Sequence, residues 1–248
     1  MSVTALLLAA GYATRLYPLT KDRPKALLPL GDGVVLDAVL GALDGIPELT
    51  KRILVTNRRF AGQFREWTRT RGDEIILVDD GTETNETRLG AIRDLELART
   101  QGHAEGDLLV LGTDNLFRWS MPEFVAQAQR HRPHASVALW EAPSRESTTA
   151  FGVVRLDHTD RITSFVEKPP QPSSTAVALC VYYLPQPTCR RIQQFLDAGG
   201  NADAPGYFLE WLIGQEATYG VSMDGVWFDI GSRAAYEAVV KNWPAVHR

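Results

Sequence analysis

The sequence contains few of the residues on which disulfide-rich domains and zinc modules depend. Only two of its 248 residues are cysteine, Cys180 and Cys189, and neither these nor the five histidines show a metal-ligand spacing. A disulfide framework and a cysteine–histidine zinc site are therefore excluded. Such sparse cysteine usage is typical of proteins in a reducing compartment, so we expect a cytoplasmic location.

Long apolar runs and basic runs are also missing. The apolar stretch at residues 3–10 follows no basic segment and is too short to cross a bilayer, so we interpret it as a first strand. The formal net charge is -4, and no basic run suggests a nucleic-acid groove. We therefore expect neither a membrane nor a nucleic acid as a partner.

The first 150 residues alternate apolar runs with amphipathic segments. Runs of strand length lie at 3–9, 52–56, 74–78, 107–111 and 136–141. Apolar residues at helical spacing between these runs predict helices over 35–43, 58–69, 87–98 and 122–131. Strands that alternate with helices predict an α/β fold, with a mostly parallel sheet covered by helices on both faces.

Shorter strands prevail after residue 150. A hairpin is predicted from 152–156 and 161–166, followed by strands at 175–184, 218–223 and 226–230 and helices at 188–197, 205–215 and 233–242. No linker, repeat or low-complexity segment interrupts the chain. We therefore expect a single domain over 1–248, with a core over 1–150 and a smaller lobe over 151–248 that covers the sheet edge.

The segment 6–30 reads LLLAAGYATRLYPLTKDRPKALLPL and carries the most specific pattern. The aliphatic run stops at the small residues 9–11, Thr14 and Arg15 follow, and Lys25 lies ten residues after the arginine. Small residues let backbone N–H groups approach a phosphate, and arginine and lysine neutralise its charge. A plain turn with solvated cations is the alternative. The length and fixed spacing of the string favour a nucleoside triphosphate site.

Two aspartates are candidate metal ligands. Asp114 ends the apolar run 107–111 within GTDN, and Asp229 follows another apolar run within WFDIGS. Carboxylates are ligands of Mg²⁺, which also binds phosphate oxygens. Either residue could instead belong to a turn or cap a helix.

A third group of candidates follows residue 150. Lys168 could bind a phosphate and Glu167 a hydroxyl, although a short Glu-Lys-Pro pattern is also typical of a charged loop. Gly152 could bring the backbone close to a ligand, or it could be a glycine at a strand edge.

Together these motifs resemble the sugar-1-phosphate nucleotidylyltransferase family. Its glycine-rich loop and T-R-L-x-P-L-T motif match residues 10–20, and its P-K matches 24–25. The D-N motif matches at Asp114, V-E-K-P at 166–169, and W-x-D-x-G at 227–231. When the loop, T-R-L-x-P-L-T and P-K are counted as one signature, four motifs in the family's order span nearly the whole chain.

The resemblance implies a Rossmann-like α/β fold in which 1–150 binds the nucleotide and 151–248 binds the acceptor. A sugar 1-phosphate would attack the α-phosphorus of a nucleoside triphosphate, and pyrophosphate would leave. Arg15, Lys25 and Asp114 would be catalytic, with Asp114 and Asp229 holding Mg²⁺ as the cofactor. The expected nucleotide-binding residues are Leu8, Ala9, Ala10, Gly11, Thr14, Arg15, Lys25, Asn85, Arg88 and Gly90.

The resemblance also assigns the acceptor side. Lys168 would bind the acceptor phosphate, Glu167 a sugar hydroxyl, and Gly152 the sugar through its backbone. The chain ends one helix after Asp229 without hexapeptide repeats, so the acyltransferase fused to bifunctional members is expected to be absent.

Two departures from the family pattern leave questions open. Ala13 replaces a loop glycine, which suggests a slightly different loop path. The segment 84–91, TNETRLGA, replaces the usual base-reading residues. The base is therefore open, and Arg88 could read it, contact a phosphate or be an ordinary helix residue.

Alternative functions also remain. One is a cytidylyltransferase with a non-sugar acceptor such as phosphocholine or a phosphonate. Another is a regulatory homologue without turnover, although all four charged residues that such homologues usually lose are present. Homo-oligomer formation stays open.

Overall fold

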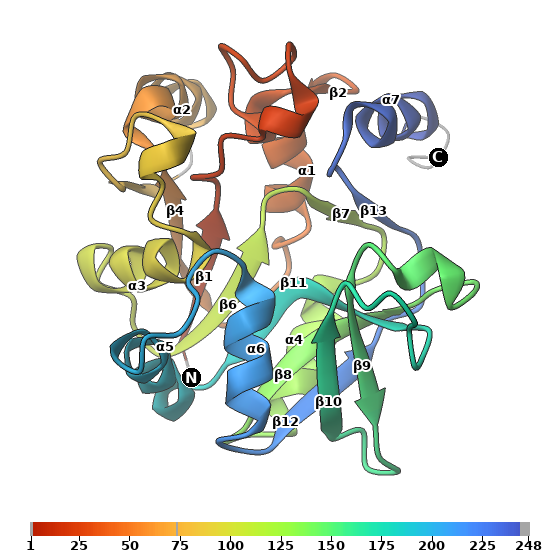
Figure 1. Cartoon of the computed structure of the whole chain (residues 1–248). Helices are drawn as coiled ribbons and strands as arrows, with labels where there is room; N and C mark the ends of the chain where they lie inside the picture. Colours follow the sequence, from red (N-terminus) through yellow and green to blue (C-terminus); the bar gives the residue numbers. More distant parts are fainter. Residues whose placement is uncertain (1, 73, 244–248) are drawn as a thin grey trace.

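A nine-stranded sheet runs through the middle of the molecule (Figure 1). The computed structural model describes residues 2–72 and 74–243. Four parallel strands lie side by side in the order β5 (Ile76–Asp79), β4 (Leu49–Thr56), β1 (Val3–Leu8) and β6 (Asp107–Gly112). These are four of the runs predicted in the first half of the chain, although β4 begins three residues earlier and β5 two residues later than predicted.

The second half of the chain extends the same sheet. Strand β11 (Ala176–Leu184) pairs antiparallel with β6. It also pairs antiparallel with β8 (Ala135–Glu141) and with β9 (Gly152–Leu156). Strand β10 (Ile162–Glu167) pairs antiparallel with β9, and β12 (Thr218–Ser222) pairs parallel with β8. Within the nine-stranded sheet, all strands except β10 and β11 thus point the same way, which confirms the predicted mostly parallel sheet. The predicted boundary near residue 150 stays a prediction.

Helices cover both faces of this sheet. They are α1 (Val35–Gly41), α2 (Arg58–Arg71), α3 (Ala91–Gln101), α4 (Met121–Gln129), α5 (Gln186–Asp197), α6 (Pro205–Ile213) and α7 (Arg233–Asn242). The side chains of β1 alternate between two buried clusters, because successive strand residues point to opposite faces. Ala5 and Leu7 pack with α1, α2 and α4, whereas Leu6 packs with α3, α5 and α6. A strand buried on both faces explains the unbroken apolar run.

The predicted helix over 87–98 begins later than expected, at Ala91. Gly90 has φ +92°, and its backbone lies against the carbonyl of Ala202, where a Cβ would be only 2.6 Å from that oxygen. Residues Asn85–Thr87 form a short 3-10 turn instead. A glycine held at positive φ thus sets the start of α3, and helical periodicity alone does not show this.

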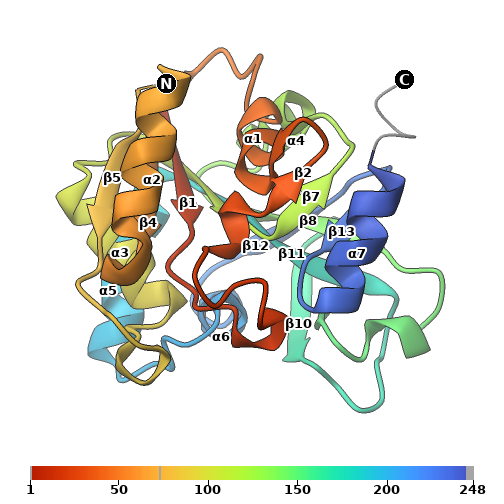
Figure 2. The ribbon, with the colours of Figure 1, turned by 90° about the horizontal axis from the view of Figure 1, so that it is seen from above.

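Two small strand pairs lie outside the main sheet, and only one of their four strands was predicted. The loop over 10–33 contains 3-10 turns at Thr14–Leu16 and Lys25–Leu27 and a hairpin of β2 (Pro29–Leu30) and β3 (Gly33–Val34). Strand β13 (Trp227–Asp229), predicted as a strand at 226–230, pairs with β7 (Asn115–Phe117) in a separate sheet. Figure 2 shows the red N-terminal loop on the side of the molecule where β7, β13 and α7 also lie.

Candidate active site

The loop after β1 is held at the edge of the sheet by contacts from both neighbouring strands. The amide of Asn57, which follows β4, donates to the carbonyl of Ala10 at 2.8 Å, and the hydroxyl of Thr113 donates to the carbonyl of Leu8 at 2.8 Å. The backbone N–H of Ala9 donates to Val55 at 2.9 Å. Gly11 then lies exposed with open space where a side chain would be. The predicted phosphate loop therefore has a fixed base and an accessible turn.

Asn57 is a residue of this site that the sequence analysis missed. Its side chain is fully buried, and its Oδ1 accepts a hydrogen bond from the N–H of Phe60, which caps α2. An asparagine between a strand and a helix is a recognisable capping signal. Its second contact, with the carbonyl of Ala10, forms because β1 pairs with β4 in the sheet. The sequence alone does not show this pairing.

Ala13 adopts the left-handed conformation, with φ 49° and ψ 43°. The hydroxyl of Thr20 donates to its carbonyl at 2.8 Å. Glycine favours this region and other residues enter it at a cost of about 1 kcal/mol. Thr14 and Arg15 follow with exposed side chains. Arg15 forms no ion pair within the part of the chain that the structure describes, so both residues are accessible to a ligand.

Lys25 is directed at the candidate metal residue. Its Nζ lies 2.7 Å from Oδ2 of Asp114 and also donates to the carbonyl of Ile230 at 3.2 Å. Only 18% of the lysine side chain is exposed, compared with 32% for Asp114. The structure thus joins the family's P-K and D-N motifs in one ion pair.

The pairing of β7 with β13 brings the second aspartate beside the first. Asp229 lies opposite Asn115 in the strand register, and the N–H of Ile230 donates to the carbonyl of Asp114 at 3.0 Å. Asn115 donates to Asp114 Oδ1 at 2.8 Å and accepts from the indole of Trp227 at 2.9 Å. The two candidate metal ligands are therefore neighbours.

The charges at this edge perturb one another. Burial raises the pKa of Asp114, but the charge and hydrogen bond of Lys25 outweigh it, so that this pKa lies below its usual value. Burial and the charge of Asp114 raise the pKa of Asp229 to about 6, an increase that Lys25, Arg15 and Lys168 limit. The five charged residues predicted from separate motifs thus act on each other in the folded protein.

Asp114 and Asp229 fit a divalent cation that also binds phosphate. Mg²⁺ is usually held by one or two carboxylates and takes its other ligands from phosphate oxygens and water. No cluster of three or more histidine, cysteine, aspartate or glutamate residues with metal-binding geometry exists within residues 2–72 and 74–243. Two carboxylates beside the predicted phosphate loop match the ligand set that Mg²⁺ uses.

The predicted acceptor residues lie together at the ends of β9 and β10. Gly152 pairs with Glu167 in the strand register, and Glu167 Oε1 lies 3.1 Å from Nζ of Lys168. A Cβ on Gly152 would lie 3.2 Å from Glu167 Oε2, and one on Gly206 would lie 2.5 Å from it. The glutamate carboxylate therefore occupies the space beside two glycines, and Gly206, at the start of α6, was not predicted.

The segment predicted to read the base is tied to a neighbouring loop. Arg88 donates to Asp203 at 2.9 Å and to the carbonyl of Asn85 at 2.9 Å. The N–H of Ile92 donates to Ala202 at 3.0 Å. Arg88 therefore connects residues 85–90 to the segment before α6. The predicted contacts of Asn85, Arg88 and Gly90 with a nucleotide stay predictions.

Comparison with known proteins identifies the family to which this chain belongs. The family model described as "Nucleotidyl transferase" matches residues 4–244. The chain belongs to the nucleotidyl transferase family. This membership confirms the resemblance that the motifs indicated. No helix in the described ranges is long and apolar enough to cross a bilayer.

Individual nucleotidyl transferases show moderate similarity. The chain is 26% identical over 238 residues to the "Bifunctional protein GlmU" of Methanococcus vannielii, covering 92% of this chain and 51% of the relative. It is 30% identical over 184 residues to the "Glucose-1-phosphate adenylyltransferase" of Nitrosomonas europaea, covering 68% of this chain and 41% of the relative. The chain thus spans about half the length, or less, of these curated relatives.

Solved structures share the fold over the whole chain. A putative glucose-1-phosphate thymidylyltransferase from Bacillus anthracis, solved with sucrose, superposes with a TM-score of 0.82 at 19% identity, covering 97% of this chain and 94% of that one. A UDP-glucose pyrophosphorylase complexed with UDP-glucose gives a TM-score of 0.81 at 18% identity, with 99% of both chains covered. The α/β, Rossmann-like fold class is thereby confirmed.

Proposed function

We propose that this chain transfers a nucleoside monophosphate group from a nucleoside triphosphate to a sugar 1-phosphate, giving a nucleotide sugar and pyrophosphate with the help of Mg²⁺. The observation that carries the proposal is the meeting of Asp114 and Asp229 with Lys25 beside the anchored loop after β1. Two carboxylates and a half-buried cation beside the predicted phosphate loop suit phosphoryl-type transfer, which depends on positioning and charge neutralisation.

The acceptor phosphate oxygen would form a bond to the α-phosphorus, while the bond from this phosphorus to the oxygen that bridges to the β-phosphate breaks. Pyrophosphate carries that bridging oxygen and the electron pair away. Arg15 and Lys25 would stabilise the negative charge that develops on the phosphate oxygens. No proton abstraction is needed, since the attacking phosphate oxygen is already anionic at neutral pH.

Mg²⁺ would be held by Asp114 and Asp229 and would supply positive charge to the triphosphate oxygens. Lys25, now bound to Asp114, would be close enough to serve a phosphate at the same place. On the acceptor side, Lys168 would bind the phosphate and Glu167 a hydroxyl. The exposed side chain of Lys168 can move away from Glu167 to do so.

A non-sugar acceptor is the second candidate, and one observation favours it. Three half-buried aromatic residues contact one another, and two of them lie next to candidate residues in the sequence: Trp227 is two residues before Asp229, and Phe151 directly precedes Gly152. The ring of Trp227 lies 5.3 Å from that of Trp140 and 4.9 Å from that of Phe151. Aromatic faces bind quaternary ammonium groups, so phosphocholine would also find a suitable surface.

A substrate panel tests both candidates. Pyrophosphate release would be measured with each common nucleoside triphosphate, with and without Mg²⁺, against sugar 1-phosphates, phosphocholine and an aminoalkylphosphonate. Turnover with a sugar 1-phosphate supports the first proposal, and turnover confined to the other acceptors supports the second. Inactivity of the wild-type protein with every pair would reject both, with the Asp229→Asn variant giving the background rate.

A further inference from the structure

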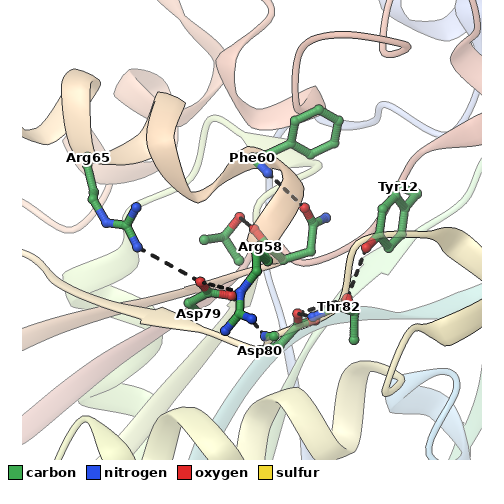
Figure 3. Close-up of polar contacts among 10 residues, drawn as sticks. Tyr12, Arg58, Phe60, Arg65, Asp79, Asp80 and Thr82 are labelled. Atoms are coloured by element: carbon green, nitrogen blue, oxygen red, sulfur yellow. Dashed lines mark hydrogen bonds and ion pairs between the residues drawn. The ribbon is translucent and has the colours of Figure 1, made fainter.

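A chain of hydrogen bonds links the loop after β1 to the segment at the end of β5, and the proposed reaction does not use it (Figure 3). The hydroxyl of Tyr12 lies 3.0 Å from that of Thr82, which follows β5. Thr82 Oγ1 lies 2.8 Å from Oδ1 of Asp80, and the N–H of Thr82 donates to the same oxygen at 2.7 Å. The buried side chain of Asp94, in the first turn of α3, lies near Asp80 and is affected by its charge.

The chemistry of these groups gives the chain a direction. A carboxylate only accepts, so the single hydroxyl proton of Thr82 goes to Asp80, and Tyr12 must therefore donate to Thr82. Burial and the nearby charge of Asp80 raise the pKa of Asp94 to about 8, so this carboxyl group is mostly protonated at neutral pH and is able to donate to Asp80.

Tyr12, Thr82 and Asp94 are buried, whereas Asp80 is half-buried. Tyr12 is 3% exposed and Thr82 and Asp94 are each 7% exposed. A buried donor that loses its acceptor cannot turn to water, so removal of one member is costly. Tyr12 lies between Gly11 and Ala13, which makes it the point where this chain holds the turn that presents Thr14 and Arg15.

We propose that Tyr12 is a positioning residue for the nucleoside triphosphate, held through its hydrogen bond to Thr82, which Asp80 holds in turn. This inference rests on the proposed function, because the loop after β1 is the proposed triphosphate loop. Hydrogen bonds from Asn57 to the carbonyl of Ala10 and from Thr113 to the carbonyl of Leu8 hold the first part of the loop. The contact of Tyr12 extends this support to the turn itself.

The test is the Tyr12→Phe variant, which removes one oxygen and keeps the ring. We expect the KM for the nucleoside triphosphate to rise about tenfold, which corresponds to roughly 1.4 kcal/mol. The KM for the acceptor should stay within twofold of the wild-type value. A purely structural defect would lower the amount of active enzyme and leave both KM values unchanged. Tyr219→Phe, a half-buried tyrosine on β12 stacked against His131, serves as the matched control.

Variants of Thr82 and Asp94 test whether the four residues act together. Thr82→Val should raise the KM for the nucleoside triphosphate as much as Tyr12→Phe does, whereas Thr82→Ser, which keeps the hydroxyl, should have the wild-type KM. The double variant Tyr12→Phe/Thr82→Val should have no higher KM than either single variant. Asp94→Asn keeps a donor toward Asp80 and should retain a near-normal KM, whereas Asp94→Leu should not. Additive effects of Tyr12→Phe and Thr82→Val, or an unchanged KM for the triphosphate, would overturn the inference.

Binding measurements separate failure of this inference from failure of the proposed function. Calorimetric titration of the wild-type protein with MgATP, MgGTP, MgCTP, MgUTP and MgdTTP, without acceptor, reports on the loop alone. If one of them binds the wild-type protein and Tyr12→Phe equally well, the positioning role is wrong while the proposed function stands. If none of these nucleoside triphosphates binds the wild-type protein, both the positioning role and the proposed function are wrong.

Discussion

Asn115 and Asp229 lie opposite each other in the register of β7 and β13, and this pairing places Asp229 beside Asp114. The same asparagine donates to Asp114 and accepts from Trp227. A short two-stranded sheet outside the main sheet thus holds the two carboxylates together.

Asp114→Asn and Asp229→Asn should each lower kcat by about 10²–10³, because each removes a charge from the site where a metal and phosphates would meet. Chelation of divalent cations should abolish the wild-type activity, and excess Mg²⁺ should restore it. Steady-state kinetics and circular dichroism would check that activity falls in a folded protein. The exposed Asp224, just before β13, provides the control Asp224→Asn. A wild-type rate in either test variant would remove that aspartate from the site.

Lys25→Met should reduce kcat by about 10²–10³ as well, since it removes a cation proposed to stabilise the transition state. It also leaves Asp114 without its ion-pair partner. Loss of one partner of a partly buried pair destabilises the protein, so thermal unfolding must accompany the kinetics. Lys241→Met, on the exposed face of α7, should change neither quantity. Equal rates for Lys25→Met and the wild type would exclude a catalytic role.

Gly206→Ala should weaken acceptor binding without affecting the nucleoside triphosphate. The added Cβ would lie 2.5 Å from Oε2 of Glu167 and 2.8 Å from the ring of Phe165, so the carboxylate must move. We expect the acceptor KM to rise about tenfold, the equivalent of 1.4 kcal/mol. Gly62→Ala in α2, where nothing lies within 4 Å, should be active and slightly more stable. An unchanged acceptor KM in Gly206→Ala would place Glu167 outside the acceptor site.

Asp94 should make stability depend on pH. Its pKa is raised from 3.8 to about 8 in the folded protein. Between these values the folded protein holds a proton that the unfolded chain has released, so the free energy of unfolding falls as the pH rises from 4 to 8. The slope from one such group is at most about 1.4 kcal/mol per pH unit, and it levels off above pH 8.

Urea denaturation at pH 5, 6, 7 and 8 would measure this slope in the wild type and in Asp94→Asn. The variant cannot titrate, so its stability should fall less over this range and should exceed that of the wild type at pH 8. Asp44→Asn, at a site 78% exposed, should keep the wild-type slope. Parallel curves for the wild type and Asp94→Asn would show that the proton is not held at Asp94.

The amino-acid sequence was enough to predict the fold class and the chemical groups of the candidate site. Apolar runs of strand length alternate with helical spacing, because a strand buried on both faces and a helix buried on one face require those patterns. The motifs around Arg15, Lys25, Asp114 and Lys168 were readable because each comprises adjacent residues.

Which distant residues meet depends on the tertiary structure. Helical periodicity could not show that α3 begins only after Gly90, because the carbonyl of Ala202, which leaves no room for a side chain there, belongs to a distant segment. The ion pair of Lys25 with Asp114 and the hydrogen bonds from Tyr12 to Thr82 and Asp80 likewise join segments that lie far apart in the sequence. Strand order and register create such contacts, and a sequence pattern records only the local preferences of each segment.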